Sequence, residues 1–311
     1  MEKIRDMLII GGGPGGYTAA LYGARAGLDT LLVEKMSPGG QMALTHQIDN
    51  YPGFADGIDG FTLGMQMQQG AERFGAETEM AEVLSADLSG EIKKVETTSG
   101  SYYARTVVLS TGAFPRPLGL PGENDWLGRG IHYCAACDGM FYRGKTVVVV
   151  GGGNTAAADA LLLSRLAKKV ILVHRRDTLR ATKIYHAPLF AAENVEFRWN
   201  GSVTALLGED SFRGVILRDL QTGEETTIDC DGVFVSIGRN PASGLFAGQV
   251  ELDKDGYIIA DESTKTNLPG VYAVGDIRTK QLRQVVTAVS DGAVAAYQAE
   301  EYLASLSGGT D

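Results

Sequence analysis

Cysteine is scarce in this sequence, which excludes a protein held together by a framework of structural disulfides. The chain has 311 residues and only 3 cysteines, an odd number and too few for a framework of structural disulfides. Two of them form the motif Cys134-Ala-Ala-Cys137, and the third is Cys230. In such a protein a C-x-x-C pair is typical of a metal site or a redox-active dithiol.

Basic residues and long apolar runs are also few. The chain carries 28 Lys and Arg against 38 Asp and Glu, a formal net charge of −10 at pH 7. Such a surface repels phosphate on average, so we expect no nucleic-acid partner. No run approaches the ~18 consecutive apolar residues of a transmembrane helix, so we expect no membrane partner. Residues 1–10 are too short an apolar stretch for a secretory signal, and we expect a cytoplasmic protein.

Proline is rare, with 9 residues, whereas glycine is abundant, with 41. One glycine cluster, residues 11–16, follows an apolar run and precedes a helix-like segment, and the next apolar run ends at Glu34. This order predicts strand, turn, helix and strand, with the motif G-x-G-x-x-G at Gly11, Gly13 and Gly16. The glycines let the backbone approach a pyrophosphate at the helix N-terminus, and Glu34 can accept hydrogen bonds from ribose hydroxyls. The segment predicts a dinucleotide site for a cofactor with a free ribose.

The same pattern returns 140 residues later, at Gly151-Gly-Gly-Asn-Thr-Ala156. Equal spacing separates Gly11 from Glu34 and Gly151 from His174, so the two units can be compared position by position. The second unit replaces the acid by His174, Arg175 and Arg176, followed by Arg180. Guanidinium groups can bind a 2′-phosphate, so this site is predicted to take NADPH. The alternative is a solvated basic start of a helix.

Prolines mark the predicted boundary between two domains. Pro115, Pro117 and Pro121 interrupt residues 113–122, and Gly238 and Pro241 close the second nucleotide unit. The strand and helix predicted at residues 270–307 have no partner of their own and should complete the first unit. We therefore expect an α/β protein with two Rossmann-like domains: residues 1–114 with 245–311, and an inserted domain of residues 115–244. Two connections at one place form a hinge.

Taken together, these motifs resemble the low-molecular-weight NADPH-dependent thioredoxin reductases, which are FAD-containing pyridine nucleotide-disulfide oxidoreductases. The resemblance covers essentially the whole chain, from "GGGPGGYTAALYGARAG" through "YCAACDG", "GGGNTA" and "HRRDTLRA" to "GVYAVGDIRTKQLRQVVTAVSDGAVAA". It implies FAD in the first domain, NADPH in the second, thioredoxin or a thioredoxin-like protein as partner, and a homodimer. The residues between the two cysteines are both alanine, and in the family these positions tune redox potential and partner fit.

By resemblance, one set of residues surrounds FAD. It comprises Gly11, Gly13, Pro14, Gly16, Glu34, Gly39, Gly40, Gln41, Asn50, Val83, Gly112, Gly275, Asp276, Arg283, Gln284 and Val285. A second set surrounds NADPH: Gly151, Gly153, Asn154, Thr155, His174, Arg175, Arg176 and Arg180.

Three interpretations of the cysteine pair can be compared. A closed zinc site needs about four ligands, and beyond Cys230 only the scattered His46, His132, His174 and His186 remain, without a second half-site. A structural disulfide across two residues would constrain the unfolded chain little and would be reducible in the cytosol. A redox dithiol fits best, because short spacing gives an exchangeable disulfide and the neighbouring Asp138 can supply a proton. No metal is expected.

The resemblance also implies roles and a reaction. Cys137 would face the flavin, Cys134 would attack the partner, and Asp138 would be the general acid, although an acid after a cysteine is often a capping residue. Cys230 is expected to be a packing residue. Hydride would pass from NADPH to FAD, then to the Cys134/Cys137 disulfide and to oxidised thioredoxin, with domain rotation between the half-reactions. The alternatives are a related flavin disulfide reductase or dithiol oxidase with another donor or acceptor, and a cofactor-holding scaffold without turnover.

Overall fold

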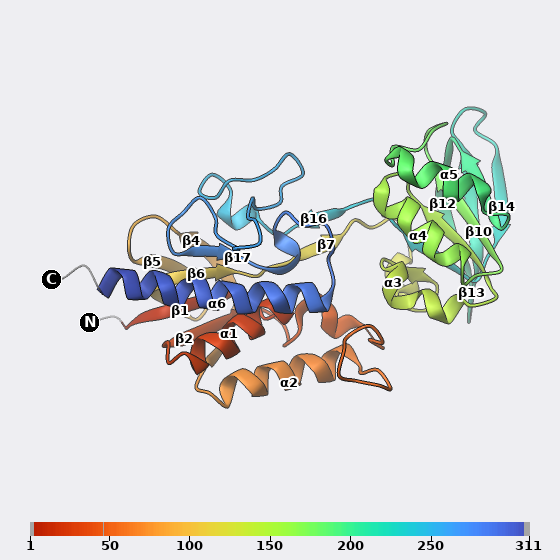
Figure 1. Ribbon diagram of the computed structural model, residues 1–311. Helices are drawn as coiled ribbons and strands as arrows, with labels where there is room; N and C mark the ends of the chain where they lie inside the picture. Colours follow the sequence, from red (N-terminus) through yellow and green to blue (C-terminus); the bar gives the residue numbers. More distant parts are fainter. Residues whose placement is uncertain (1–2, 46, 308–311) are drawn as a thin grey trace. The chain divides into compact units, whose positions relative to one another are not determined.

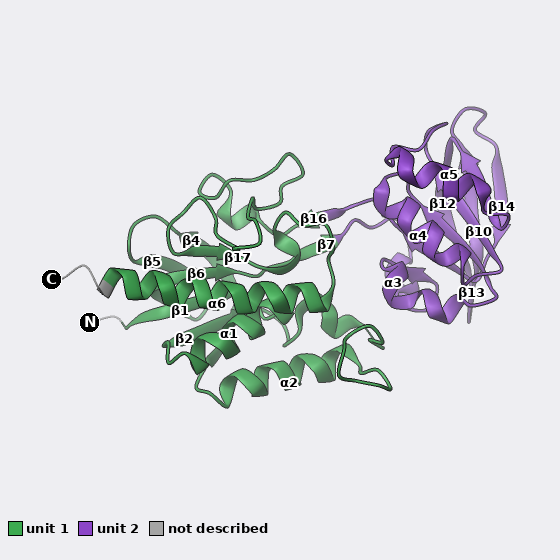
Figure 2. Ribbon diagram, viewed as in Figure 1, with its two compact units in different colours: residues 1–114, 240–311 green, residues 115–239 purple. Residues whose placement is uncertain are grey.

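The protein is described by a computed structural model that covers residues 3–45 and 47–307 (Figure 1). His46, one of the scattered histidines, lies outside the described residues. The chain divides into two compact units (Figure 2): Met1–Phe114 with Asn240–Asp311, and Pro115–Arg239.

A mostly parallel sheet forms the centre of unit 1. Its strands are β1 (Ile4–Ile10), β2 (Thr30–Glu34), β3 (Glu77–Met80), β4 (Val83–Asp87), β5 (Lys93–Thr97), β6 (Gly100–Leu109) and β17 (Val271–Ala273). The order is β3-β2-β1-β6-β5-β4, and β17 also pairs with β6. The pairs of β1 with β2 and β6, of β2 with β3, and of β6 with β17 are parallel, whereas β5 pairs antiparallel with β4 and β6. β1 and β2 consist largely of consecutive buried apolar residues, as expected for parallel strands covered on both faces.

Helices cover this sheet. They are α1 (Pro14–Arg25), α2 (Gly60–Glu72) and α6 (Val285–Ser307), with short 3-10 turns η1 (Gly40–Leu44), η5 (Gly244–Phe246) and η6 (Gly275–Ile277). Figure 1 shows α6 alongside α1. A Cβ atom at Gly292 would lie 2.2 Å from the carbonyl oxygen of Gly15, so the contact between these two helices requires glycine. The C-terminal β17 and α6 therefore complete unit 1.

Unit 2 contains two sheets. The first is fully parallel, in the order β11-β10-β9-β15-β8, and the second is antiparallel, in the order β12-β13-β14. The strands of the first are β8 (Ile131–His132), β9 (Thr146–Val150), β10 (Lys169–His174), β11 (Val195–Trp199) and β15 (Gly232–Val235). Those of the second are β12 (Gly201–Gly208), β13 (Phe212–Asp219) and β14 (Glu225–Asp229). The helical segments are η2 (Glu123–Trp126), α3 (Ala135–Asp138), η3 (Gly139–Tyr142), α4 (Asn154–Ser164), η4 (Lys183–Tyr185) and α5 (His186–Ala191).

The chain passes between the units in two short strands, β7 (Ala113–Pro115) and β16 (Arg239–Pro241), which pair with each other. The second crossing lies between Arg239 and Asn240 rather than between residues 244 and 245. The physical reason is that two residues before position 245 already bond to unit 1: the backbone N–H of Ala242 donates to the carbonyl oxygen of Gly112 at 2.9 Å, and the hydroxyl of Ser243 donates to that of Gly256 at 2.6 Å.

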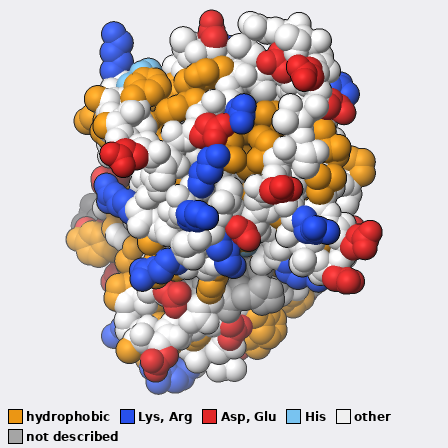
Figure 3. All heavy atoms as spheres, turned by 90° about the vertical axis from the view of Figure 1, so that its right-hand side faces the viewer, with side chains coloured by type: hydrophobic (Ala, Val, Ile, Leu, Met, Phe, Trp, Pro, Cys, Tyr) orange, Lys and Arg blue, Asp and Glu red, His pale blue; other side chains and the backbone are white. Residues whose placement is uncertain are grey.

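Two further properties of the described residues are the apolar character of their helices and the distribution of charge on their surface. Among residues 3–45 and 47–307, none of the helices combines the length and apolar character needed to cross a membrane. On the face shown in Figure 3, acidic and basic side chains are interspersed.

Candidate functional site

Cys134 and Cys137 are joined by a disulfide, with their Cα atoms 5.3 Å apart. Cys134 is the N-cap residue of α3, and its sulfur accepts the backbone N–H of Cys137 at 3.2 Å. Both cysteines are partly exposed, so an exchange partner can reach them.

Asp138 is the carboxylate of this site, and its side chain is 22% exposed. Its Oδ2 lies 2.8 Å from Nδ1 of His132, whose other ring nitrogen lies 2.6 Å from the hydroxyl of Tyr142. The His132 ring also stacks on Phe234, with ring centroids 5.2 Å apart. The sequence drew attention to Asp138 and His132 but gave no reason to include Tyr142.

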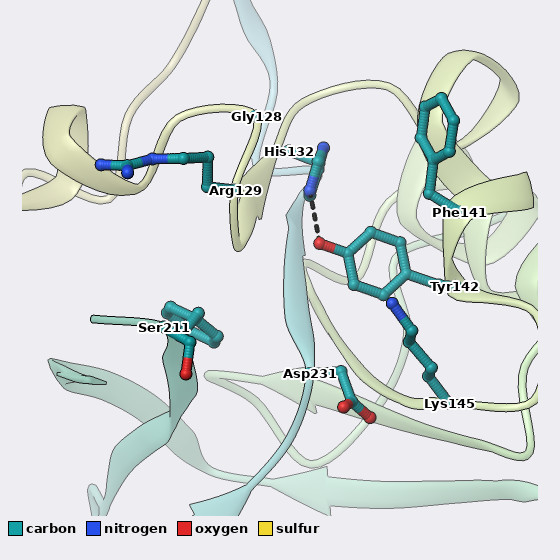
Figure 4. Close-up of a pocket in the computed structure, with 9 residues that line it drawn as sticks. Gly128, Arg129, His132, Phe141, Tyr142, Lys145, Ser211 and Asp231 are labelled. Carbon is teal, nitrogen blue, oxygen red and sulfur yellow. Dashed lines mark hydrogen bonds between the residues drawn. The ribbon is translucent and has the colours of Figure 1, made fainter. Parts of the chain in front are cut away.

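A pocket of unit 2 adjoins this network (Figure 4). His132 and Tyr142 lie on one side of it, and the side chains of Lys145 and Asp231 lie near the Tyr142 ring. The ammonium group of Lys145 is 5.2 Å from the centroid of that ring. Burial and the nearby Asp138 and Asp231 raise the pKa of Tyr142 to about 12, so its hydroxyl stays protonated at neutral pH.

The third cysteine packs in the core of unit 2. Cys230 is buried, and burial together with the neighbouring Asp231 raises the pKa of its thiol to about 12. The neutral thiol belongs to an apolar cluster with residues such as Ile131, Phe212 and Val233. This agrees with the packing role expected from the sequence.

The first glycine cluster lies in unit 1, between β1 and α1. A Cβ atom at Gly16 would lie 2.0 Å from the carbonyl oxygen of Gly11, whereas one at Gly13 would meet no atom within 4 Å. Pro14 begins α1. Glu34 is buried at the end of β2, and its carboxylate accepts the backbone N–H groups of Gly12 at 2.6 Å and Met36 at 2.9 Å. Each of its oxygens keeps a further lone pair for a ligand hydroxyl.

Several other residues of unit 1 that were predicted to bind FAD contact the glycine loop of residues 11–16 or one another. The backbone N–H of Gly39 donates to the carbonyl oxygen of Gly12 at 2.8 Å, and a Cβ at Gly40 would lie 3.5 Å from Cα of Gly13. Gln41 follows in η1. The Asn50 amide donates to the side-chain oxygen of Gln284 at 3.1 Å, which joins two segments far apart in the sequence.

The remaining predicted residues of unit 1 lie at the ends of its elements. Val83 begins β4, Val285 begins α6, and Asp276 lies in η6 after Gly275. Arg283 donates to the carbonyl oxygen of Asp276 at 3.3 Å. Gly112 and Gly275 both have φ of +71°, which only glycine adopts readily.

The second glycine cluster lies in unit 2, between β9 and α4. A Cβ atom at Gly152 would lie 2.3 Å from the His174 ring, and one at Gly153 would meet nothing within 4 Å. His174 is buried, and burial followed by its arginine neighbours lowers the pKa of its ring. Its Nε2 is buried and has no hydrogen-bond partner among the described residues.

Basic groups surround this loop. Arg175, Arg176 and Arg180 are exposed, and the backbone N–H of Arg180 donates to the carbonyl oxygen of Gly152 at 2.7 Å. Asn154, the first residue of α4, accepts the backbone N–H of Thr182 at 2.8 Å, and Thr155 follows it. The structure thus places the arginine segment beside Gly152. It also adds Thr182, which sequence reasoning did not include.

The sequence of this chain is similar to those of known redox proteins. The family model described as pyridine nucleotide-disulphide oxidoreductase matches residues 5–292. The chain is 45% identical to a thioredoxin reductase of Peptoclostridium acidaminophilum, over 97% of this chain and 98% of that protein. It is 46% identical to a thioredoxin reductase of Streptomyces clavuligerus, over 98% and 96%.

Solved structures agree with these sequence matches. The thioredoxin reductase of Streptococcus pyogenes has a TM-score of 0.90 and 43% identity, covering 98% of this chain and all of that one. The Giardia duodenalis enzyme also has a TM-score of 0.90, at 32% identity, covering 97% of this chain. These likenesses confirm the predicted α/β fold class with two Rossmann-like domains.

Proposed function

Because the chain belongs to the pyridine nucleotide-disulphide oxidoreductase family, and within it to the thioredoxin reductases, we propose that it reduces the disulfide of thioredoxin with electrons from NADPH. The Cys134–Cys137 disulfide with Asp138 beside it is the observation that carries this proposal. A bound FAD would link the nicotinamide to the sulfurs, since a flavin accepts a hydride and passes its two electrons to a disulfide.

Residues of unit 1 fit an FAD cofactor. The backbone at Gly13 faces open space at the N-terminus of α1, where a pyrophosphate can accept backbone N–H groups. Glu34 is fixed by two backbone N–H groups and has lone pairs left for ribose hydroxyls. The Gly39–Gln41 loop, Asn50 and Val83 would hold the flavin and the adenine. Gly112, Gly275, Asp276, Arg283, Gln284 and Val285 would hold the rest of the cofactor.

Residues of unit 2 fit NADPH. The backbone at Gly153 faces open space, and Gly151, Asn154 and Thr155 would bind the pyrophosphate at the start of α4. The orphaned Nε2 of His174 and the exposed Arg175, Arg176 and Arg180 fit a 2′-phosphate, because guanidinium groups bind phosphate oxygens by charge-assisted hydrogen bonds. We assign NADPH to Pro115–Arg239 and FAD to the discontinuous unit 1 on this basis.

The cysteines would perform the exchange reaction. The thiolate of Cys134 attacks a sulfur of the thioredoxin disulfide, and a mixed disulfide forms as the other sulfur leaves. Cys137 then attacks Cys134, which restores the disulfide and releases reduced thioredoxin. Asp138 would be the general acid for the thiolate that forms.

Four broader features belong to this proposal. The paired β7 and β16 would act as a hinge that rotates the units between the two half-reactions. The active form would be a homodimer in the cytoplasm, without a metal ion.

A reduction assay in the absence of oxygen tests this function. Purified protein should be yellow, NADPH should bleach the flavin far faster than NADH does, and added oxidised thioredoxin should restore the colour. Cys134→Ser and Cys137→Ser should abolish the return of colour, whereas Cys230→Ser, which changes the buried thiol, should preserve it. Return of colour with oxygen but not with thioredoxin would indicate a dithiol oxidase instead. Colourless protein that cannot be reconstituted with FAD would refute the proposal.

A further inference from the structure

A chain of hydrogen bonds leads away from the cysteine pair. It runs from Asp138 Oδ2 to His132 Nδ1, at 2.8 Å, and from His132 Nε2 to the hydroxyl of Tyr142, at 2.6 Å. His132 and Tyr142 are 4% and 6% exposed, and both line the pocket of Figure 4. Carboxyl, imidazole and phenol groups can each donate and accept a proton, so the chain can conduct one.

We propose that His132 and Tyr142 relay a proton from this pocket to Asp138, and this role rests on the proposed function. Reduction of one disulfide by NADPH consumes one proton from solvent, according to NADPH + H⁺ + RSSR → NADP⁺ + 2 RSH. Asp138 gives its proton to a cysteine thiolate and becomes a carboxylate. The carboxylate takes the Nδ1 proton of His132, Nε2 takes the hydroxyl proton of Tyr142, and water in the pocket replaces that proton. Both electrons come from NADPH, and the relay carries only the proton.

The geometry satisfies the chain in both of its states. After a proton has passed to Asp138, its O–H can donate to Nδ1 while Nε2–H donates to Tyr142. When Asp138 is ionised, the tyrosine hydroxyl can donate to Nε2 while Nδ1–H donates to the carboxylate. Neither state leaves a buried polar atom of the chain without a partner. Passage of one proton therefore exchanges the two tautomers of His132, and the ring must exchange its protons with water to regain Nδ1–H before the next passage.

Packing fixes the relay in place. The His132 ring stacks on Phe234 at a centroid distance of 5.2 Å, and Tyr142 meets the edge of Phe234 at 5.3 Å. The titratable and charged groups around the two relay residues and their pocket are Arg129, Asp138, Lys145, Cys230 and Asp231. The hydroxyl of Tyr142 has a pKa of about 12, so it rests in the protonated form and can donate.

The relay gives Asp138 a path for protons that does not pass the cysteine sulfurs. Asp138 directly follows Cys137 and its side chain is 22% exposed, so a partner in contact with the sulfurs would also shield this carboxylate from water. The carboxylate then needs a source of protons on another side, and the pocket lined by His132 and Tyr142 provides it. His132 acts through Asp138 and is thus a positioning and relay residue rather than a catalytic one.

The test compares two tyrosines that each lose one hydroxyl. Tyr142→Phe breaks the relay and keeps the ring against Phe234. Tyr133→Phe is the matched control, because the hydroxyl of this neighbour of Cys134 donates to Glu123 at 2.6 Å and is not part of the chain. Both variants are assayed as the FAD-loaded protein with NADPH and oxidised thioredoxin, from acidic to alkaline pH. Each assay is repeated with increasing imidazole buffer at constant ionic strength.

We expect Tyr142→Phe to lower kcat about tenfold at alkaline pH, where free protons are scarce, with KM for thioredoxin unchanged. Imidazole should restore kcat, because a small buffer acid can enter the pocket and replace the hydroxyl. Tyr133→Phe should show neither the loss nor the dependence on buffer. Equal kcat values in the two variants, or a loss that imidazole does not reverse, would overturn the relay.

A second measurement does not depend on turnover. Long-range proton–nitrogen NMR spectra of the full chain are recorded in the disulfide form and after reduction by dithiothreitol, and His132→Gln identifies the His132 signals among 4 histidines. We expect a neutral His132 ring whose tautomer differs between the two forms. A ring that carries two protons in both forms at every pH would show a static ion pair with Asp138 and would overturn the proposal. If the unmodified protein fails to reduce thioredoxin with NADPH, the proposed function fails, and this experiment still tests the relay.

Discussion

Asp291 of α6 accepts hydrogen bonds from Arg278 at 2.7 and 2.9 Å, and the side chains of both residues are almost completely buried. The same carboxylate also accepts from Lys280 at 2.7 Å and from the backbone N–H of Gly275 at 2.8 Å. One acidic side chain thus ties α6 to the turn that carries Asp276, a residue assigned to FAD.

Removal of this carboxylate should destabilise unit 1. Asp291→Ala leaves the buried Arg278 without its main partner, and we expect a loss of about 3–5 kcal/mol in the free energy of unfolding. Urea unfolding followed by circular dichroism measures it. The control is Glu262→Ala, because Glu262 lies 3.6 Å from Arg278 but is 95% exposed and should contribute almost nothing. Similar stabilities of the two variants would contradict the buried network.

The carboxylate of Glu34 should be required for flavin retention. Glu34→Ala removes the acceptor of two backbone N–H groups and of the ribose hydroxyls, so we expect FAD affinity to fall roughly tenfold or more. Flavin content after purification and titration of the apoprotein with FAD measure this change. Glu82→Ala is the control, since Glu82 is exposed and pairs with Lys35. Full flavin content in Glu34→Ala would remove the assignment of this residue.

The arginines after β10 should determine the choice of nicotinamide cofactor. We expect the double change Arg175→Ala and Arg176→Ala to raise KM for NADPH by roughly tenfold to a hundredfold while KM for NADH stays constant. Arg198→Ala provides the control, because Arg198 is exposed in β11 and pairs with Glu196. Equal increases for both cofactors would point to a general effect on the fold.

Burial of Cys230 predicts a dependence of stability on alkaline pH. The thiol has an ordinary pKa of 9.0 and a pKa of about 12 in the folded protein, so folding favours its neutral form. Its contribution to stability is fully present below pH 9 and is lost as the pH rises toward 12. Unfolding experiments across this range should show a steeper fall for the unmodified protein than for Cys230→Ala. Parallel curves would mean that the thiol titrates normally.

Repeated local patterns explain how much the sequence could predict. The runs before Gly11 and Gly151 and the equal distances to Glu34 and His174 predicted the two parallel sheets and their loops. This works because a glycine loop between a buried strand and a helix is determined by nearby residues. The chain boundary near Asn240 was less predictable, because it depends on the hydrogen bonds of Ala242 and Ser243 with unit 1 and not on local composition.

Contacts across the fold could not be predicted from spacing. Tyr142 reaches His132 because η3 turns its side chain back toward β8, and nothing in "GMFYRG" indicates this pairing. Likewise, Asp291 lies in the helix predicted within residues 270–307, but its partner Arg278 precedes that helix in an irregular segment that the sequence did not connect with it. Such pairs depend on tertiary packing.

The pairing of β17 with β6 and of α6 with α1 has a consequence for biosynthesis. A ribosome makes all of Pro115–Arg239 before β17 and α6, so the inserted unit can leave the exit tunnel and fold while the final strand and helix of the surrounding unit are still inside it. We expect nascent chains stalled early in α6, where the whole insert has left the exit tunnel, to resist protease within the insert and to be cleaved in the segments translated earlier.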